Sequence, residues 1–151
     1  MTERPGLSVD DVAKARATRG AQVGPGTVRA AVAIGSAIFG SERAPPPPER
    51  LVYLAGEVED FLARSGPRAR AVLTVMIWLV TLVAPICVGR LGSLGTLSQA
   101  DRVRALDRLE RRFGEPLVAV KAILCLIYYE HPDAAREIGF DGECRHTRAA
   151  P

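Results

Sequence analysis

Residues 71–88, AVLTVMIWLVTLVAPICV, form the least polar stretch of the chain and carry no charged side chain. A second apolar segment, residues 117–129 (LVAVKAILCLIYY), carries Lys121 as its single charge. No stretch of the chain alternates apolar and polar residues in the way that a half-buried strand does. We therefore predict an all-α fold, in which residues 117–129 form the central helix.

Three more helices are predicted around these two segments, which makes a compact bundle of about five helices. Residues 27–39 form a short apolar helix with Thr27 as its N-cap. Residues 49–64 repeat apolar side chains at helical spacing, so that one face is buried. Residues 98–114 form an amphipathic helix that Ser98 opens as its N-cap.

The 151 residues suit one compact domain and leave little room for a second. Residues 1–26 alternate charged residues with Ala, Gly and Pro, which predicts a flexible N-terminal arm. Residues 27–142 form the helical domain, and residues 143–151 form a short polar C-terminal tail. The four prolines at 45–48 predict a short extended connector within the domain.

Charge and aromatic content argue against a nucleic-acid partner. The net charge is only +3, and the arginines are interleaved with acidic residues instead of forming a basic stripe. Aromatic residues make up 5% of the chain, which is too few for a platform that stacks bases.

Cysteine usage and the N-terminal sequence indicate a reducing compartment. Cys87 and Cys125 lie in apolar runs, where a free thiol behaves as a small buried side chain. Residues 1–20 contain neither an apolar signal-peptide core nor a twin-arginine motif. We therefore expect a cytoplasmic protein, with membrane association as the alternative.

Sequence motifs for catalysis or metal binding are missing. The chain contains no G-x-S-x-G, H-E-x-x-H, G-x-x-x-x-G-K-[ST] or G-x-G-x-x-G sequence. His131, Asp141, Cys144 and His146 lack the paired spacing of a zinc site. For Lys121 we favour a side chain that lies along the bundle and reaches water or a carboxylate, over a buried catalytic ammonium. We expect no enzymatic activity, no metal and no bound cofactor.

Residues 71–88 reach the lower length limit for a membrane span, which needs about 20 apolar residues. Arginines flank the segment on both sides, so the charges predict no orientation. Two nearly apolar helices imply more apolar surface than their amphipathic neighbours can cover. We therefore favour a core or partner-facing helix and expect the isolated chain to self-associate. A small membrane-anchored protein that uses residues 71–88 remains the alternative.

Three short motifs follow one another in the second half of the chain. Residues 97–102 (LSQADR) begin a helix, residues 128–132 (YYEHP) end a later one, and residues 138–142 (IGFDG) form a turn. This order resembles the small helical subunit, or fused N-terminal helical domain, of glucose-methanol-choline-type flavoprotein dehydrogenases. The gluconate 2-dehydrogenase subunit 3 family is a group of such chains, and the resemblance covers residues 27–142.

The resemblance implies a non-catalytic accessory subunit that packs on a large FAD-dependent oxidoreductase and supports it. In that family FAD and the catalytic histidine belong to the large subunit, so FAD is expected on the partner and not on this chain. Docking is expected at the Tyr128–Tyr129 end of the bundle, together with one apolar helix. The predicted interface residues are Trp78, Lys121, Tyr128, Tyr129, His131, Pro132 and Phe140.

Overall fold

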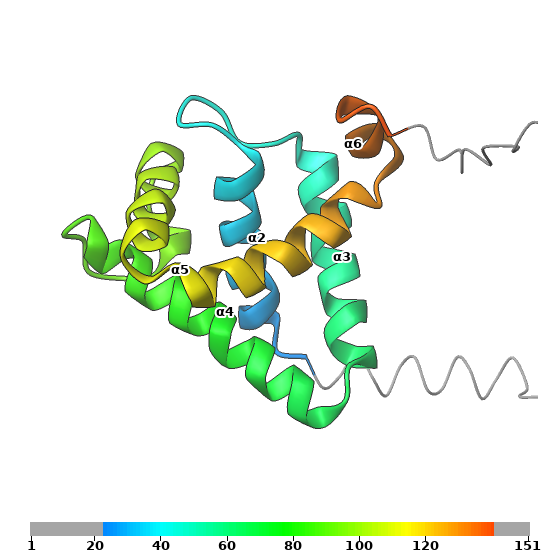
Figure 1. The fold of residues 1–151 in the computed structure, drawn as a ribbon, viewed down its shortest axis with the longest axis horizontal. Coiled ribbons are helices and arrows are strands. Elements are labelled where there is room, and N and C mark those ends of the chain that lie inside the picture. The colour runs from blue at the N-terminus through cyan, green and yellow to red at the C-terminus, as the bar shows by residue number, and fades with distance from the viewer. Residues whose placement is uncertain (1–22, 141–151) are drawn as a thin grey trace, which may run out of the picture.

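The computed structural model describes residues 23–140, without the side chains of residues 115 and 116. Every regular element in that range is helical, which confirms the all-α prediction. Most of the predicted arm and the whole predicted tail lie outside the described residues. The elements are α2 (Pro25–Phe39), α3 (Pro48–Arg64), α4 (Pro67–Cys87), the 3₁₀ helix η1 (Leu94–Thr96), α5 (Gln99–Tyr129) and α6 (Pro132–Glu137) (Figure 1).

Proline marks the start of four of these helices, α2, α3, α4 and α6. Its fixed φ suits the first turn, where a backbone N–H has no helical partner to lose. The prediction that Thr27 caps the first helix is wrong. Gly24 holds the extended cap conformation and the helix begins at Pro25, because proline at the first position outweighs the capping preference of threonine. Thr27 is buried inside α2.

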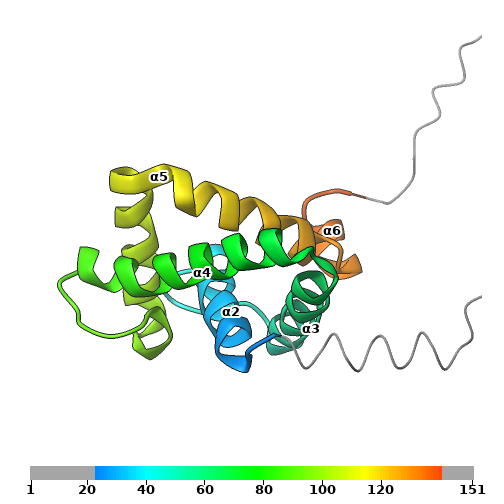
Figure 2. The ribbon, with the colours of Figure 1, turned by 90° about the horizontal axis from the view of Figure 1, so that it is seen from below.

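The helix α2 occupies the middle of the molecule and packs against α3, α4, α5 and η1 (Figure 1; Figure 2). Its inward side is built from small residues, and a methyl group at Gly35 would lie 2.5 Å from Cδ2 of Leu54. The prediction that residues 117–129 form the central helix is wrong. Val118 and Leu126 on that segment are 55% and 71% exposed, so one of its sides faces outward.

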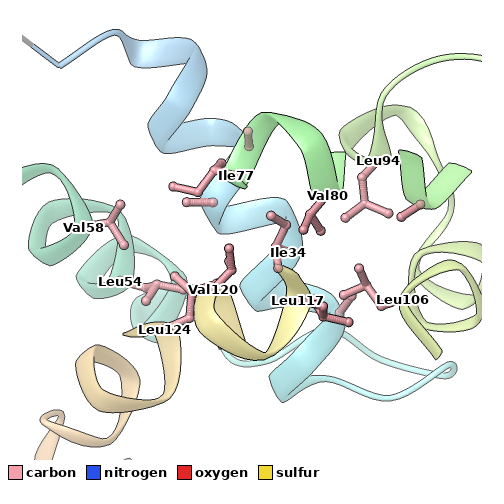
Figure 3. Close-up of a cluster of buried hydrophobic side chains, with 14 of the residues drawn as sticks. Ile34, Leu54, Val58, Ile77, Val80, Leu94, Leu106, Leu117, Val120 and Leu124 are labelled. Carbon is pink, nitrogen blue, oxygen red and sulfur yellow. The ribbon is translucent and has the colours of Figure 1, made fainter. Parts of the chain in front are cut away.

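The core is a cluster of aliphatic side chains that project from α2, α3, α4 and α5 toward one another (Figure 3). Each fully buried aliphatic side chain contributes about 1.5–3 kcal/mol relative to exposure, so this cluster supplies most of the stabilisation. The bulkiest members with no more than 1% exposure are Ile34, Leu54, Val80, Leu94 and Leu117.

The fourth and fifth predicted helices are the two arms of α5. The backbone leaves helical geometry at Phe113 (φ −145°, ψ 56°), and the arms diverge there (Figure 1). Pro116 follows closely and has no N–H to give to a helical ladder. The predicted cap at Ser98 is confirmed, because its Oγ accepts a hydrogen bond from the N–H of Asp101 at 3.2 Å.

Candidate functional site

Most of the predicted interface residues gather where the end of α5 meets α6. Tyr128 and Tyr129 close α5, His131 caps α6, and Pro132 is its first residue. Phe140 follows α6 and is 62% exposed. The order of the motifs in the sequence therefore brings these residues to one end of the bundle (Figure 1).

Tyr128 belongs to the core and is only 4% exposed. Its ring stacks on Phe39 of α2, with centroids 3.9 Å apart and planes within 7°. Tyr129 meets Phe39 edge-on at 5.9 Å and is half-buried. Of the tyrosine pair expected at the interface, only Tyr129 therefore reaches the surface, because the ring of Tyr128 is used to attach α5 to α2.

A buried arginine attaches α6 to α3. Arg50 is 9% exposed, and its two Nη atoms donate to the carboxylate of Glu137 at 2.6 and 2.7 Å. Arg50 also donates to the hydroxyl of Tyr128 at 3.4 Å. The bond from Arg50 lowers the pKa of Glu137, and the same contacts raise the pKa of Arg50. This paired contact fixes the position of α6 beside α5.

An open apolar groove of about 540 Å³ lies between the end of α5 and α6. Leu126, Ile138 and Phe140 stand in it with 71%, 60% and 62% of their surface exposed. Glu130 is the one charged residue of the lining. The α5–α6 groove is lined by Ala122, Cys125, Leu126, Tyr129, Glu130, Ala135, Ile138 and Phe140.

Cys125 is the nucleophilic side chain of the α5–α6 groove. Burial raises the pKa of its thiol, and the charge of Lys121 offsets only part of that effect. A raised pKa keeps the thiol protonated near neutral pH. The groove therefore offers Cys125 as an apolar contact and not as an activated thiolate.

Lys121 makes a structural ion pair. Its Nζ donates to both carboxylate oxygens of Glu110, at 3.2 and 3.3 Å, and so connects the two arms of α5 across the break at Phe113. The head of Lys121 therefore reaches a carboxylate, as the favoured interpretation of the sequence predicted. Lys121 does not line the α5–α6 groove.

The remaining predicted residues hold their helices in place. Nδ1 of His131 accepts from the N–H of Asp133 at 3.3 Å and caps α6, and the ring of Tyr53 meets it edge-on at 5.0 Å. Trp78 lies away from the α5–α6 groove, on α4. Its Nε1–H donates to Oγ1 of Thr27 at 3.3 Å. The ring contact of Tyr53 with His131 joins α3 to α6, and the hydrogen bond of Trp78 with Thr27 joins α4 to α2.

Within residues 23–140 no group of three or more His, Cys, Asp or Glu side chains could hold a metal ion. Asp141, Cys144 and His146, the remaining candidates for a metal site, lie outside the described residues. Of the candidates for chemistry that the structure does place, His131 is used in a cap and Lys121 in an ion pair.

One described helix, α4, is long and apolar enough to cross a membrane by length and composition. Its most apolar window has a mean hydropathy of 2.0, and 28% of that window is buried in the protein. Core helices of soluble proteins pass the same test but are mostly buried. The outward side of α4 is therefore a second large apolar surface, apart from the α5–α6 groove.

Two features of these surfaces are absent from the sequence predictions. The ion pair of Arg50 with Glu137 joins residues that are far apart in the chain, and no local sequence pattern predicts it. Ile138 was taken only as part of a turn, yet it is exposed on the wall of the groove. The signal in the sequence was the presence of two apolar residues, Ile138 and Phe140, in one glycine-rich turn.

Comparisons with protein-family models, with curated proteins and with solved structures found no match to this chain. The resemblance to the small subunits of flavoprotein dehydrogenases therefore depends on the short motifs of the second half of the chain.

Proposed function

We propose that this chain is a non-catalytic helical accessory subunit and that the α5–α6 groove is the surface on which a larger protein docks. The observation that supports this most directly is the exposure of Leu126, Ile138 and Phe140 around one apolar hollow. Exposed apolar side chains that gather in one place, instead of being scattered singly, commonly mark interaction sites.

The composition of the α5–α6 groove suits the centre of an interface. Tyr129 and Phe140 supply aromatic surface, which is enriched in the buried centres of interfaces, and charged residues are depleted there. The walls are held rigidly, because Arg50 and Glu137 fix α6 and the stacked Phe39–Tyr128 pair fixes α5. A preformed groove binds with less loss of conformational freedom.

The partner that the sequence resemblance implies is a large FAD-dependent oxidoreductase subunit in the cytoplasm. That subunit would carry FAD and the catalytic residues, and this chain would support its folding and stability. The structural use of Lys121 in an ion pair with Glu110, and of His131 as a cap, supports a role without chemistry on this chain.

The test is recovery of the tagged chain from its source organism, followed by a visible absorbance spectrum of the eluate. We expect a large co-purifying chain with the spectrum of bound flavin. Phe140→Gln combined with Leu126→Gln should lose that partner, because both remove apolar surface from the groove. Val52→Gln on α3, at a position 73% exposed, is the matched control and should keep it.

A large partner that lacks flavin would keep the docking role and remove the oxidoreductase assignment. Recovery of a monomeric chain without any partner would contradict both.

A second candidate function is a small membrane-anchored protein that uses residues 71–88, and the hydropathy of α4 favours it. Extraction of membranes with alkaline carbonate distinguishes the two, because a spanning helix stays in the pellet. Leu79→Arg should then abolish retention, since a charge in the middle of a span is costly. Full release of the unaltered chain would remove this candidate.

A further inference from the structure

A row of five large aliphatic side chains follows the outward side of α4. Its members recur every three or four residues, which places them on one side of a helix, opposite the buried Ile77, Val80 and Ala84. We call them the outer row. They are Val72, Val75, Leu79, Leu82 and Ile86, which are 56%, 64%, 44%, 49% and 62% exposed.

Arginines surround the outer row. Residues 67–90 contain no acidic residue. Arg68 precedes Val72 by one helical turn on the same side and is exposed. Arg90 follows the helix and pairs with Asp101 at 3.8 Å. On the flank, exposed Arg29 of α2 shares a surface pocket of about 450 Å³ with Trp78. The outer row is therefore apolar along its length, with positive charge from Arg68 at its first turn and from Arg29 on its flank.

Arg68 places a positive charge in the first turn of α4, where the helix dipole makes a positive charge unfavourable. The first turn of α4 contains arginine and no acid, although the helix dipole favours negative charge there. A local preference that a sequence breaks commonly marks a residue kept for another purpose. Attraction to a negatively charged surface is a purpose that fits this position.

Pairing of the outer row with a second copy of α4 is disfavoured by these charges. A parallel pair would set Arg68 against Arg68, and an antiparallel pair would set Arg68 beside Arg90, whose charge Asp101 offsets only in part. The positions that flank the row carry Met76, Trp78 and Val83, so they lack the charges that select a partner helix in coiled coils. Helices that lie on membranes share the exposed apolar side with basic residues and a tryptophan beside it. On α4 the opposite side is apolar too and is covered by the bundle.

We propose that α4 is a membrane-binding face that lies flat on a bilayer of anionic lipids, with the outer row inserted at the boundary between the lipid head groups and the acyl chains. Its 21 residues would present about 31 Å of helix to the surface. The proposal does not depend on the proposed docking function, since the α5–α6 groove and the outer row are lined by different residues.

A helix that lies flat on a membrane can keep its packing in the bundle, whereas a helix that spans the membrane cannot. Ile77, Val80 and Ala84 pack into the core, together with α2 and α5. A spanning α4 would have to withdraw these side chains from the bundle. Flat binding leaves them in place and uses only the side of α4 that the protein does not cover.

Trp78 provides the measurement, because it is the single tryptophan of the chain and lies beside the outer row at 37% exposure. The purified full chain is titrated with vesicles of phosphatidylglycerol and phosphatidylcholine in equal parts, and with vesicles of phosphatidylcholine alone. We expect a blue shift of tryptophan emission and co-sedimentation with the anionic vesicles only. Binding should weaken in high salt, which screens the arginines.

Matched variants locate the binding surface. Val75→Gln with Leu82→Gln should weaken vesicle binding at least about tenfold, because both remove inserted apolar surface. Val52→Gln with Val118→Gln alters exposed positions on α3 and α5, outside both apolar surfaces, and should change binding less than about twofold. Arg68→Gln should weaken it about fivefold, whereas Arg43→Gln, in the loop between α2 and α3, should not.

Three results would overturn the proposal. The first is the absence of binding to either kind of vesicle. If the chain then also forms a dimer, and the Val75 and Leu82 substitutions break that dimer, the outer row binds a second copy of the chain instead. The second is equal binding to neutral vesicles. The third is quenching of Trp78 by labels at the bilayer centre together with loss of the thermal unfolding transition, which would assign a span. Unfolding of each variant in solution checks that it remains folded.

Discussion

The helices α2 and α4 are both rich in apolar residues and lack acidic side chains, yet α2 is mostly buried and α4 is mostly at the surface. Eight of the 15 residues of α2 are buried, against five of the 21 residues of α4. The apolar residues of α2 are mostly Ala and Gly, which allow neighbouring helices to approach on several sides. The apolar residues of α4 are mostly Val, Leu and Ile, and they surround the whole helix.

The difference shows that apolar composition by itself does not place a helix in the centre. Side-chain size decides how closely neighbours can pack, and a bundle of this size covers only one side of a long, bulky helix. The uncovered side of α4, like the α5–α6 groove, is then apolar surface available for binding. The following predictions test this contrast between buried and exposed positions, from the largest expected effect to the smallest.

Two isoleucines test the contrast between α2 and α4 directly. Ile34 on α2 is fully buried, and Ile34→Ala should destabilise the fold by about 2–5 kcal/mol because it leaves a cavity. Ile86→Ala on α4 removes the same atoms from a side chain that is 62% exposed, and should cost less than about 1 kcal/mol. Urea unfolding of both variants measures the difference. Equal losses would show that α4 is covered in the folded chain.

Replacing either of two helical glycines by alanine should change the free energy of unfolding, in opposite directions. At Gly35 a new methyl group would lie 2.5 Å from Cδ2 of the fully buried Leu54, so Gly35→Ala should destabilise by about 1–2 kcal/mol. At Gly56 on α3 no atom lies within 4 Å of the same methyl group. Gly56→Ala should therefore stabilise by about 0.5–1 kcal/mol through helix propensity. Thermal unfolding of the pair checks both signs, and stabilisation by both changes would refute the close packing of α2 on α3.

A hydrogen bond connects α2 to α4, and its loss should have a moderate effect. Thr27→Val removes the acceptor of Trp78 Nε1–H and should cost about 1 kcal/mol. Thr96→Val removes an exposed hydroxyl that donates to the carbonyl of Ser93, and should change stability by less than about 0.5 kcal/mol. Denaturant unfolding compares the two, and no loss from Thr27→Val would show that water replaces this contact.

The smallest effect is expected from the ion pair of α3 with α6, because Glu137 is largely exposed. Its pKa is lowered from the ordinary value of 4.5 by Arg50, so the folded state favours the ionised carboxylate. That stabilisation is present above about pH 5 and is lost as the pH falls through the lowered pKa of the folded state. The unfolding temperature should therefore fall less between pH 5 and about pH 3 in Glu137→Gln than in the unaltered chain.

Asp107→Asn is the control for Glu137→Gln, because Asp107 pairs with Arg111 at an exposed site within α5. It should leave the pH dependence close to that of the unaltered chain. The same response in both variants would contradict a special contribution of the Arg50–Glu137 pair.

The sequence predicted the helices well because their signals are local. Prolines and the Ser98 cap lie at the boundaries, and the apolar segments 71–88 and 117–129 form helices or parts of helices. The sequence did not indicate which helix is central. The central position depends on how small residues such as Gly35 pack against Leu54 across the bundle. Tyr128 was expected at the interface, and its burial depends on Phe39, a partner that is distant in the chain. His131, Pro132 and Phe140 were placed at one end because they follow one another in sequence.

The docking role of the α5–α6 groove is the central claim, and cross-linking from the groove inside the source organism tests it most directly. A photo-reactive residue is placed at Leu126 in one strain and at Val52 in another, two positions of almost equal exposure. We predict that Leu126 captures one large chain, that this chain carries a flavin, and that Val52 does not capture it. Capture of the same proteins from both positions, or of none from Leu126, would contradict the account.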